Sequence, residues 1–125
     1  MGAMGYCFGG TCVPDIAWDG GADIRSVVSF HGGLAGNGLD NGPTIAKLLV
    51  LHGADDPMVP PEQVAEFQAE MTAMGVDWQF VSYSNTVHAF TRPEANSPEI
   101  GALYNPVADR RSWDAMLAFF EETLA

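Results

Sequence analysis

Three short apolar runs along the chain have the pattern of buried β-strands. They cover Ile24 to Phe30, Ile45 to Leu51 and Trp78 to Tyr83. The second run is apolar except for Lys47, and a near-continuous apolar run is typical of a parallel strand that is covered on both faces. The third run is rich in aromatic and β-branched residues, which favour strands. We therefore predict three buried strands, preceded by a very short strand over Met1 to Gly5.

Between and after these runs, apolar residues recur at spacings of three and four, the period of an amphipathic helix. One such pattern runs from Pro61 to Met74, where proline suits the first helical turn and Gly75 is placed to end the helix. A shorter helix is predicted over Thr11 to Ala17, although Pro14 weakens it. The last helix is predicted from about Ala108 to Leu124, with an apolar stripe of Trp113, Met116, Leu117, Phe120 and Leu124.

The alternation of strands and helices predicts an α/β fold with about four mostly parallel strands, flanking helices and right-handed crossovers. Two stretches without a clear period are expected to be loops: His31 to Thr44, with five glycines, and Arg92 to Val107, with three prolines. We find no internal repeat and no low-complexity tract. Residues 1–125 are therefore expected to form a single domain.

The composition and charge exclude several classes of function. Nearly half of the residues (47%) are hydrophobic, which suits a folded globular protein rather than a disordered one. The formal net charge is -11, and such a surface repels phosphate backbones and anionic lipid, so we expect neither a nucleic-acid nor a membrane partner. No apolar run approaches the roughly 20 residues that cross a bilayer. The first residues also lack the basic and apolar regions of a secretory signal.

The two cysteines, Cys7 and Cys12, are too few for a disulfide scaffold. Their spacing fits neither a CxxC redox motif nor a zinc site, so we expect reduced thiols and a cytoplasmic protein. A zinc site built from the three histidines needs a convergence that no spacing in the sequence indicates. We therefore expect no metal and no cofactor.

A pentapeptide near the start of the chain has the form of a nucleophile elbow. Gly5-Tyr6-Cys7-Phe8-Gly9 reads G-x-C-x-G, the thiol counterpart of G-x-S-x-G. In such an elbow a strand turns sharply into a helix, and the flanking glycines relieve the crowding around a strained central residue. The helix N-terminus favours a thiolate at Cys7, and the N–H of Phe8 would point to where an oxyanion develops. The alternative, a small buried cysteine in a glycine-rich turn, fits the pentapeptide equally well.

An acidic pair and a histidine follow two of the predicted strands. Asp55 and Asp56 come just after the strand that ends at Leu51, and His88 comes after the strand that ends at Tyr83. The carboxyl ends of parallel strands form the crevice in which open α/β sheets place their sites. A cysteine nucleophile needs a histidine as its proton partner, and an acid then fixes the tautomer of the imidazole. The order nucleophile, acid, histidine is also that of the α/β-hydrolases.

Four segments resemble the dienelactone hydrolase family in sequence and order: Gly5 to Gly10, Ser29 to Gly32, Gly53 to Asp56 and His88 to Phe90. Members of that family hydrolyse a lactone ester through a Cys-His-Asp triad. The resemblance implies a hydrolase that acts on small esters or lactones.

Carried over by motif, the resemblance makes Cys7 the nucleophile and His88 the base. Asp56 is the acid in preference to Asp55, because the family pattern puts the acid three residues after the glycine. Arg92, four residues after the histidine, matches a position at which lactone-cleaving members hold the substrate carboxylate. An arginine solvated on a loop is the alternative for that position.

The resemblance spans nearly the whole chain but only about the C-terminal half of the family's domain, so the expected fold is a truncated α/β-hydrolase fold. The family's second oxyanion N–H comes from the other half, and losing one such donor typically costs about 10²–10³ in rate. The strand before the elbow would lie at an open sheet edge, so we expect a homo-oligomer or a partner chain that covers this edge. The second functional hypothesis is a catalytically inactive remnant that persists as an oligomeric or partner-binding module.

Overall fold

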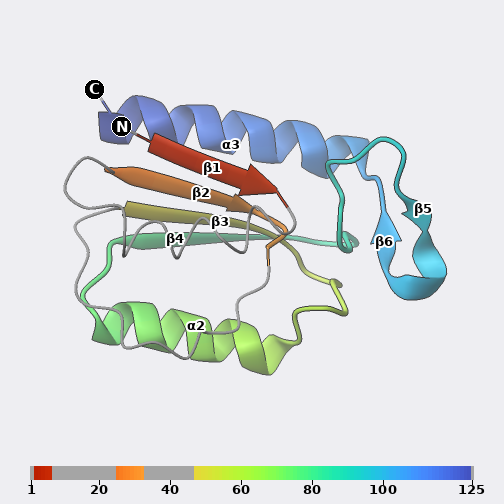
Figure 1. The fold of residues 1–125 in the computed structure, drawn as a ribbon, viewed down its shortest axis with the longest axis horizontal. Coiled ribbons are helices and arrows are strands. Elements are labelled where there is room, and N and C mark those ends of the chain that lie inside the picture. Colours follow the sequence, from red (N-terminus) through yellow and green to blue (C-terminus); the bar gives the residue numbers. More distant parts are fainter. Residues whose placement is uncertain (1, 7–24, 33–46, 125) are drawn as a thin grey trace.

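A parallel β-sheet lies between two helices in the computed structural model, which describes residues 2–6, 25–32 and 47–124 (Figure 1). Within these residues the main sheet has the order β1-β2-β3-β4, and each neighbouring pair is parallel. The predicted α/β fold with four parallel strands is therefore confirmed. The strands are β1 (Gly2–Tyr6), β2 (Ser26–Phe30), β3 (Lys47–Gly53) and β4 (Trp78–Tyr83).

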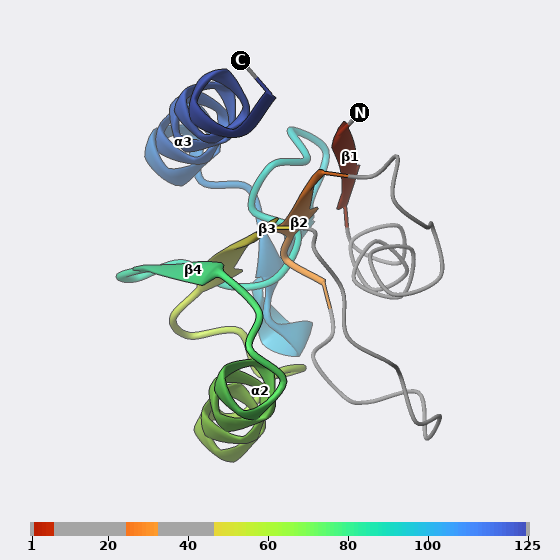
Figure 2. The same ribbon diagram turned by 90° about the vertical axis from the view of Figure 1, so that its left-hand side faces the viewer.

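The central strands are buried because each face of the sheet is covered by a helix. Figure 2 shows α2 (Pro61–Ala73) and α3 (Pro106–Leu124) on opposite sides of the sheet. Side chains alternate along a strand, so Leu48 and Val50 pack with the residues of α2, whereas Leu49 and Leu51 pack with those of α3. This two-sided burial explains why β3 reads as a continuous apolar run.

The helix α2 follows the prediction closely. Its buried residues, Phe67 and Met71, lie on the predicted apolar stripe, and Val64 and Met74 pack beside them. The helix is followed by Gly75 with φ of 72°, a left-handed conformation that glycine adopts without strain.

The helix α3 begins two residues before the predicted start, and only part of its predicted stripe is buried. Asn105 Oδ1 accepts hydrogen bonds from the N–H groups of Val107 and Ala108, which caps the first turn. Trp113 and Leu117 remain 45% and 50% exposed. The face of α3 that packs on the sheet lies to one side of the predicted apolar stripe. The buried residues of the helix are Ala108, Ser112, Met116 and Phe119.

The segment from Arg92 to Val107 is not a plain loop as predicted. It contains the antiparallel strands β5 (Asn96–Ser97) and β6 (Ala102–Leu103), joined by a 3₁₀ turn, η2 (Pro98–Ile100). These elements are two or three residues long, too short to produce a recognisable period in the sequence. The predicted helix over 11–17 and most of the predicted loop over 31–44 lie outside the described residues. None of the helices in the described part is both long and apolar enough to cross a bilayer.

Candidate active site

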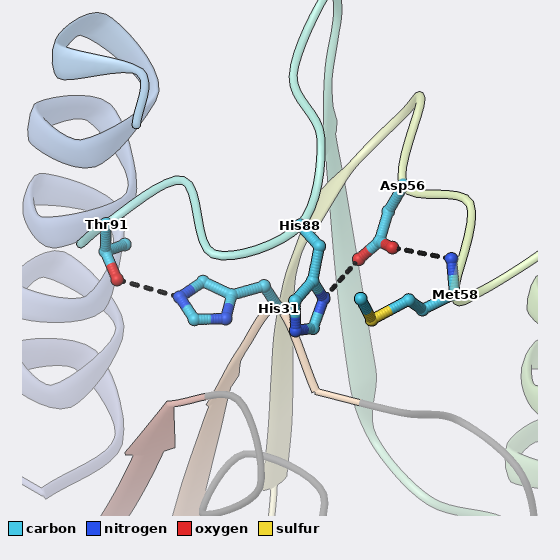
Figure 3. Close-up of polar contacts among 5 residues, drawn as sticks. All are labelled: His31, Asp56, Met58, His88 and Thr91. Atoms are coloured by element: carbon cyan, nitrogen blue, oxygen red, sulfur yellow. Dashed lines mark hydrogen bonds and ion pairs between the residues drawn. The ribbon is translucent and has the colours of Figure 1, made fainter. Parts of the chain in front are cut away.

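A buried carboxyl–imidazole pair lies at the carboxyl ends of β3 and β4. His88 Nδ1 is 2.8 Å from Asp56 Oδ2, and the two residues are 9% and 4% exposed. The other carboxyl oxygen, Oδ1, accepts a hydrogen bond from the backbone N–H of Met58 at 2.9 Å. Figure 3 shows the Asp56 carboxyl between the His88 ring and the backbone of Met58. Contacts on both oxygens fix the carboxyl, which in turn orients the His88 ring.

Gly53 allows the two loops that carry this pair to approach each other. A Cβ atom at this position would lie 2.6 Å from the backbone oxygen of Thr86 and 2.7 Å from that of Val87, closer than any side chain can tolerate. The absence of a side chain lets the loop after β4 lie directly against the end of β3. The glycine three residues before Asp56 is therefore the local reason that His88 reaches the acid.

The short hairpin after the site supports His88 from the other side. The N–H of His88 donates to Gly101 O at 2.9 Å, and the N–H of Leu103 donates to His88 O at 3.1 Å. Gly101 has φ of 77°, and a Cβ atom there would lie 2.2 Å from Pro57 Cγ, so a glycine is needed both for conformation and for space. The hairpin, which the sequence did not predict, therefore ties His88 to the loop that contains Asp56.

His31 is a second histidine in the same cluster. It follows β2 directly, is 1% exposed, and its Nε2 lies 2.8 Å from Thr91 Oγ1. Its ring makes an edge-on contact with the His88 ring, with centroids 5.4 Å apart and an interplanar angle of 71°. The Phe90 ring lies 5.0 Å away in a similar arrangement. Figure 3 shows His31 between Thr91 and His88, where it forms one wall of the site.

Burial keeps the His31 ring uncharged. The loss of hydration lowers the pKa of His31 from 6.5 to about 4, and the neighbouring His88 acts in the same direction. Within the described residues its Nδ1 is buried without a hydrogen-bond partner. A neutral ring beside His88 adds no positive charge that would compete with protonation of His88.

The pH dependence of stability follows from this lowered pKa. The unfolded chain binds a proton at His31 near pH 6.5, whereas the folded chain binds it only near pH 4, so acid favours unfolding. Between pH 7.5 and 4.5 the contribution of His31 to the free energy of unfolding should fall by about 2.5 kcal/mol. Urea unfolding of the parent and of His31→Phe at both pH values measures this effect. Between pH 7.5 and 4.5 the free energy of unfolding of the parent should fall by about 2.5 kcal/mol more than that of the variant. An equal loss of stability in both proteins would contradict the assignment.

Arg92 forms an exposed ion pair rather than a contact with the buried pair. Its Nη2 lies 3.0 Å from Glu94 Oε1, and the two side chains are 56% and 65% exposed. The Arg92 charge is still among the influences that lower the pKa of His31, although a weaker one than burial. The Arg92 side chain is therefore exposed, yet near enough to the cluster to influence His31.

Cys7 and Phe8, the predicted nucleophile and oxyanion donor, lie outside the described residues. Tyr6, the residue before Cys7, is the last residue of β1. Its ring stacks on Phe30 with centroids 4.3 Å apart and lies 5.9 Å from the ring of His31. The end of β1 is therefore connected to His88 through ring contacts with His31.

The third histidine, His52, lies away from the pair, on the α2 face of the sheet. Its ring contacts Phe80, with centroids 5.4 Å apart. Among the described residues, no group of three or more His, Cys, Asp or Glu side chains is placed to hold a metal ion.

The structure thus brings together Asp56 and His88, the predicted acid and base. His31 directly follows a predicted strand, so its position at this crevice was expected from the sequence, whereas that of Thr91 was not. The only indication for Thr91 was its sequence position, three residues after His88.

One known protein family matches nearly the whole chain. The sequence profile of the dienelactone hydrolase family matches residues 1–124. An uncharacterized protein of Caenorhabditis elegans is 38% identical over 135 residues, which cover 100% of this chain and 81% of the nematode protein.

Solved structures show the same relationship. A dienelactone hydrolase-like promiscuous phosphotriesterase from metagenomic libraries has 40% sequence identity and a TM-score of 0.89, over 98% of this chain and 52% of that protein. A putative dienelactone hydrolase of Klebsiella pneumoniae has 25% identity and a TM-score of 0.79, over 96% of this chain and 51% of that protein. The chain spans about half the length of these two solved proteins.

Proposed function

Because the chain belongs to the dienelactone hydrolase family, within the α/β-hydrolase superfamily, we propose that it hydrolyses small esters or lactones through a triad of Cys7, His88 and Asp56. The observation that carries the proposal is the buried hydrogen bond between His88 Nδ1 and Asp56 Oδ2 at the ends of two parallel strands. A histidine held in this way presents its other nitrogen for proton transfer.

The ring contacts between Tyr6, His31 and His88 support the place of Cys7 in this triad. Cys7 is the next residue in the sequence after Tyr6, the last residue of β1. Parallel strands also point their carboxyl ends to the same edge of the sheet.

The proposed reaction proceeds in two steps. The Cys7 thiolate attacks the ester carbonyl carbon, and the C–O bond to the leaving oxygen breaks as His88 Nε2 donates a proton to that oxygen. An ester then releases its alcohol, whereas a lactone ring opens and keeps the new hydroxyl group on the acyl chain. In both cases the acyl group remains on Cys7 as a thioester. Water then attacks the thioester while His88 accepts its proton, and the acid product leaves as the thiolate is restored. Asp56 stabilises the protonated imidazole in both steps.

Phe8 and Arg92 have supporting roles in this proposal. The Phe8 N–H donates a hydrogen bond to the oxyanion that forms in each step. Arg92 binds a carboxylate of the substrate, which takes the place of Glu94 in the present ion pair. This arrangement favours small substrates that carry a negative charge beside the ester.

Turnover of an activated ester by the chain tests the proposal. We expect hydrolysis of p-nitrophenyl acetate and, in samples quenched with acid, an acetyl group on Cys7 detected by mass spectrometry. An activated phosphotriester serves as a second substrate, because the relative of 40% identity is a phosphotriesterase. A folded chain that turns over neither substrate would instead favour the inactive remnant.

We also propose that a second copy of the chain packs against β1 and α3. Among the described strands β1 has β2 as its only neighbour, and Met4 on β1 is 37% exposed. On α3, Trp113 and Leu117 lie four residues apart, so their exposed side chains share one helix face. Apolar surface of this kind is typical of an interface, and two-fold dimers are the commonest assembly.

Light scattering coupled to size exclusion measures this association. The parent chain should elute with a mass above that of one copy, and Trp113→Lys should lower the apparent mass. Ala118→Lys makes the same change of charge at an exposed position of the same helix, so it is the matched control and should behave as the parent does. A monomeric parent at micromolar concentration would rule out the dimer.

A further inference from the structure

A cavity of about 160 Å³ lies between the ends of β3 and β4 and the start of α2. It is on the α2 face of the sheet, and the loop that carries Asp56 forms part of its wall. The proposed triad does not use it. The lining residues are His52, Ala54, Val59, Pro61, Val64 and Ser82.

His52 is one of two polar residues that line this cavity in the described part of the chain, with Ser82 as the other. His52 is 4% exposed, and within the described residues its ring has no hydrogen bond. Unlike His31 Nδ1, its ring nitrogens are not among the buried polar atoms of the described residues that lack a partner, and the residue lines the cavity. The ring also contacts Phe80.

The chemistry of the cavity favours an uncharged ligand with one hydrogen-bonding group. Burial lowers the pKa of His52, so at neutral pH its ring offers one donor and one acceptor. Val59, which is 3% exposed, and Val64 supply apolar walls. An anion is disfavoured by the net charge of -11 and by the carboxylate of Asp56, which acts on His52 electrostatically.

The cavity is open to solvent on one side, and its volume of about 160 Å³ has room for about one small ring. An apolar cavity of about 150 Å³ in another protein holds a benzene molecule. The present cavity has a similar volume, but it adds the His52 ring and the hydroxyl group of Ser82, which lies opposite His52 in the register of β3 and β4. A ring that carries a hydroxyl group fits both the volume and the polar groups.

We propose that this cavity, the His52 cavity, is a second binding site that takes a small neutral molecule with an apolar body and one hydroxyl group. The hydroxyl group hydrogen-bonds to His52, and the apolar body lies against Val59 and Val64. The site is separate from the proposed triad, and its occupant would contact Ala54 and Val59 on either side of the Asp56 loop. The proposal does not depend on the proposed hydrolase activity.

Titration of the isotope-labelled full chain with phenol, followed by NMR, tests the proposal. We expect saturable shifts in the methyl signals of Ala54, Val59 and Val64, with an affinity in the millimolar range. Benzene, which lacks the hydroxyl group, should bind about threefold to tenfold more weakly. Benzoate, which has a ring of the same size but a negative charge, should produce no saturable shift.

Two variants separate the hydrogen bond from the cavity itself. His52→Phe keeps a ring but removes the hydrogen bond, so phenol and benzene should bind to it equally. Val64→Phe fills the cavity from a half-buried position on α2, so neither compound should bind. If His52→Phe does not fold, Val64→Phe and the benzoate control still decide the question. Shifts that do not saturate, that lie elsewhere, or that persist in Val64→Phe would overturn the proposal.

Discussion

Replacing Cys7 with alanine is expected to lower kcat for an activated ester by about 10³-fold or more, because the group that forms the thioester is removed. The KM value should change little, since no substrate contact outside the reacting centre is lost. The other residues of a triad cannot replace the nucleophile, so this variant should have the largest effect of any single substitution in the chain. Stopped-flow or steady-state release of p-nitrophenol measures it.

Cys12 provides the matched control for this experiment. It is the only other cysteine in the chain and lies five residues further along, in the predicted first helix. Cys12→Ala should retain nearly the turnover of the parent. Equal turnover in Cys7→Ala and the parent would show that the nucleophile is elsewhere, whatever the family resemblance.

Replacing Asp56 with asparagine is expected to lower kcat by about 10²–10⁴-fold, because an amide in place of the carboxylate changes the tautomer of His88 and no longer stabilises the charged imidazole. The carboxyl of Asp56 is buried and bonded through both oxygens, so asparagine can keep the N–H···O contact from Met58 while losing the charge. The loss should appear in kcat rather than in KM. Steady-state kinetics and a thermal unfolding curve for the same sample separate this effect from loss of folding.

The neighbouring carboxylate offers a control of the same chemistry. Asp55 is exposed, and its backbone N–H donates a hydrogen bond to Thr86 O in the loop after β4. Asp55→Asn should therefore leave kcat within about twofold of the parent, as is usual for a surface change away from the reacting groups. If Asp55→Asn lowered kcat as much as Asp56→Asn, the choice of Asp56 as the triad acid would be wrong.

The strands β2 and β3 could be predicted from the sequence because both of their faces are buried, and α2 could be predicted because its buried residues recur at helical spacing. Apolar residues therefore occur on both faces of each of these strands, as in Val27 and Val28 and in the run from Leu48 to Leu51. A short run of that kind is typical of a buried parallel strand. The helix α3 was harder to interpret. Its apolar stripe is wider than the face that contacts the sheet, and the pattern alone does not distinguish buried Met116 from exposed Leu117.

The site could be predicted only in part. The positions of Asp56 and His88 follow from the strands that precede them in the sequence, whereas the residues packed around them depend on the tertiary fold. Asp56 and His88 each follow a recognisable strand, and parallel strands bring such residues to one edge. The position of His31 against His88, and of Gly101 against Pro57, depends on how separate loops fold together. Neither contact has a spacing in the sequence that would reveal it.

The central claim is that the Cys7 thiol and the His88 imidazole share one site, and the pH dependence of Cys7 alkylation tests it without requiring turnover. In a Cys12→Ala background, the rate of reaction with iodoacetamide should reach half its maximum below about pH 7.5, since a nearby histidine lowers the pKa of a thiol. Adding His88→Gln should move that midpoint toward about pH 8.5, the value of a free cysteine. Identical midpoints near pH 8.5 in both proteins would contradict the claim, because they would show that the thiol does not interact with His88.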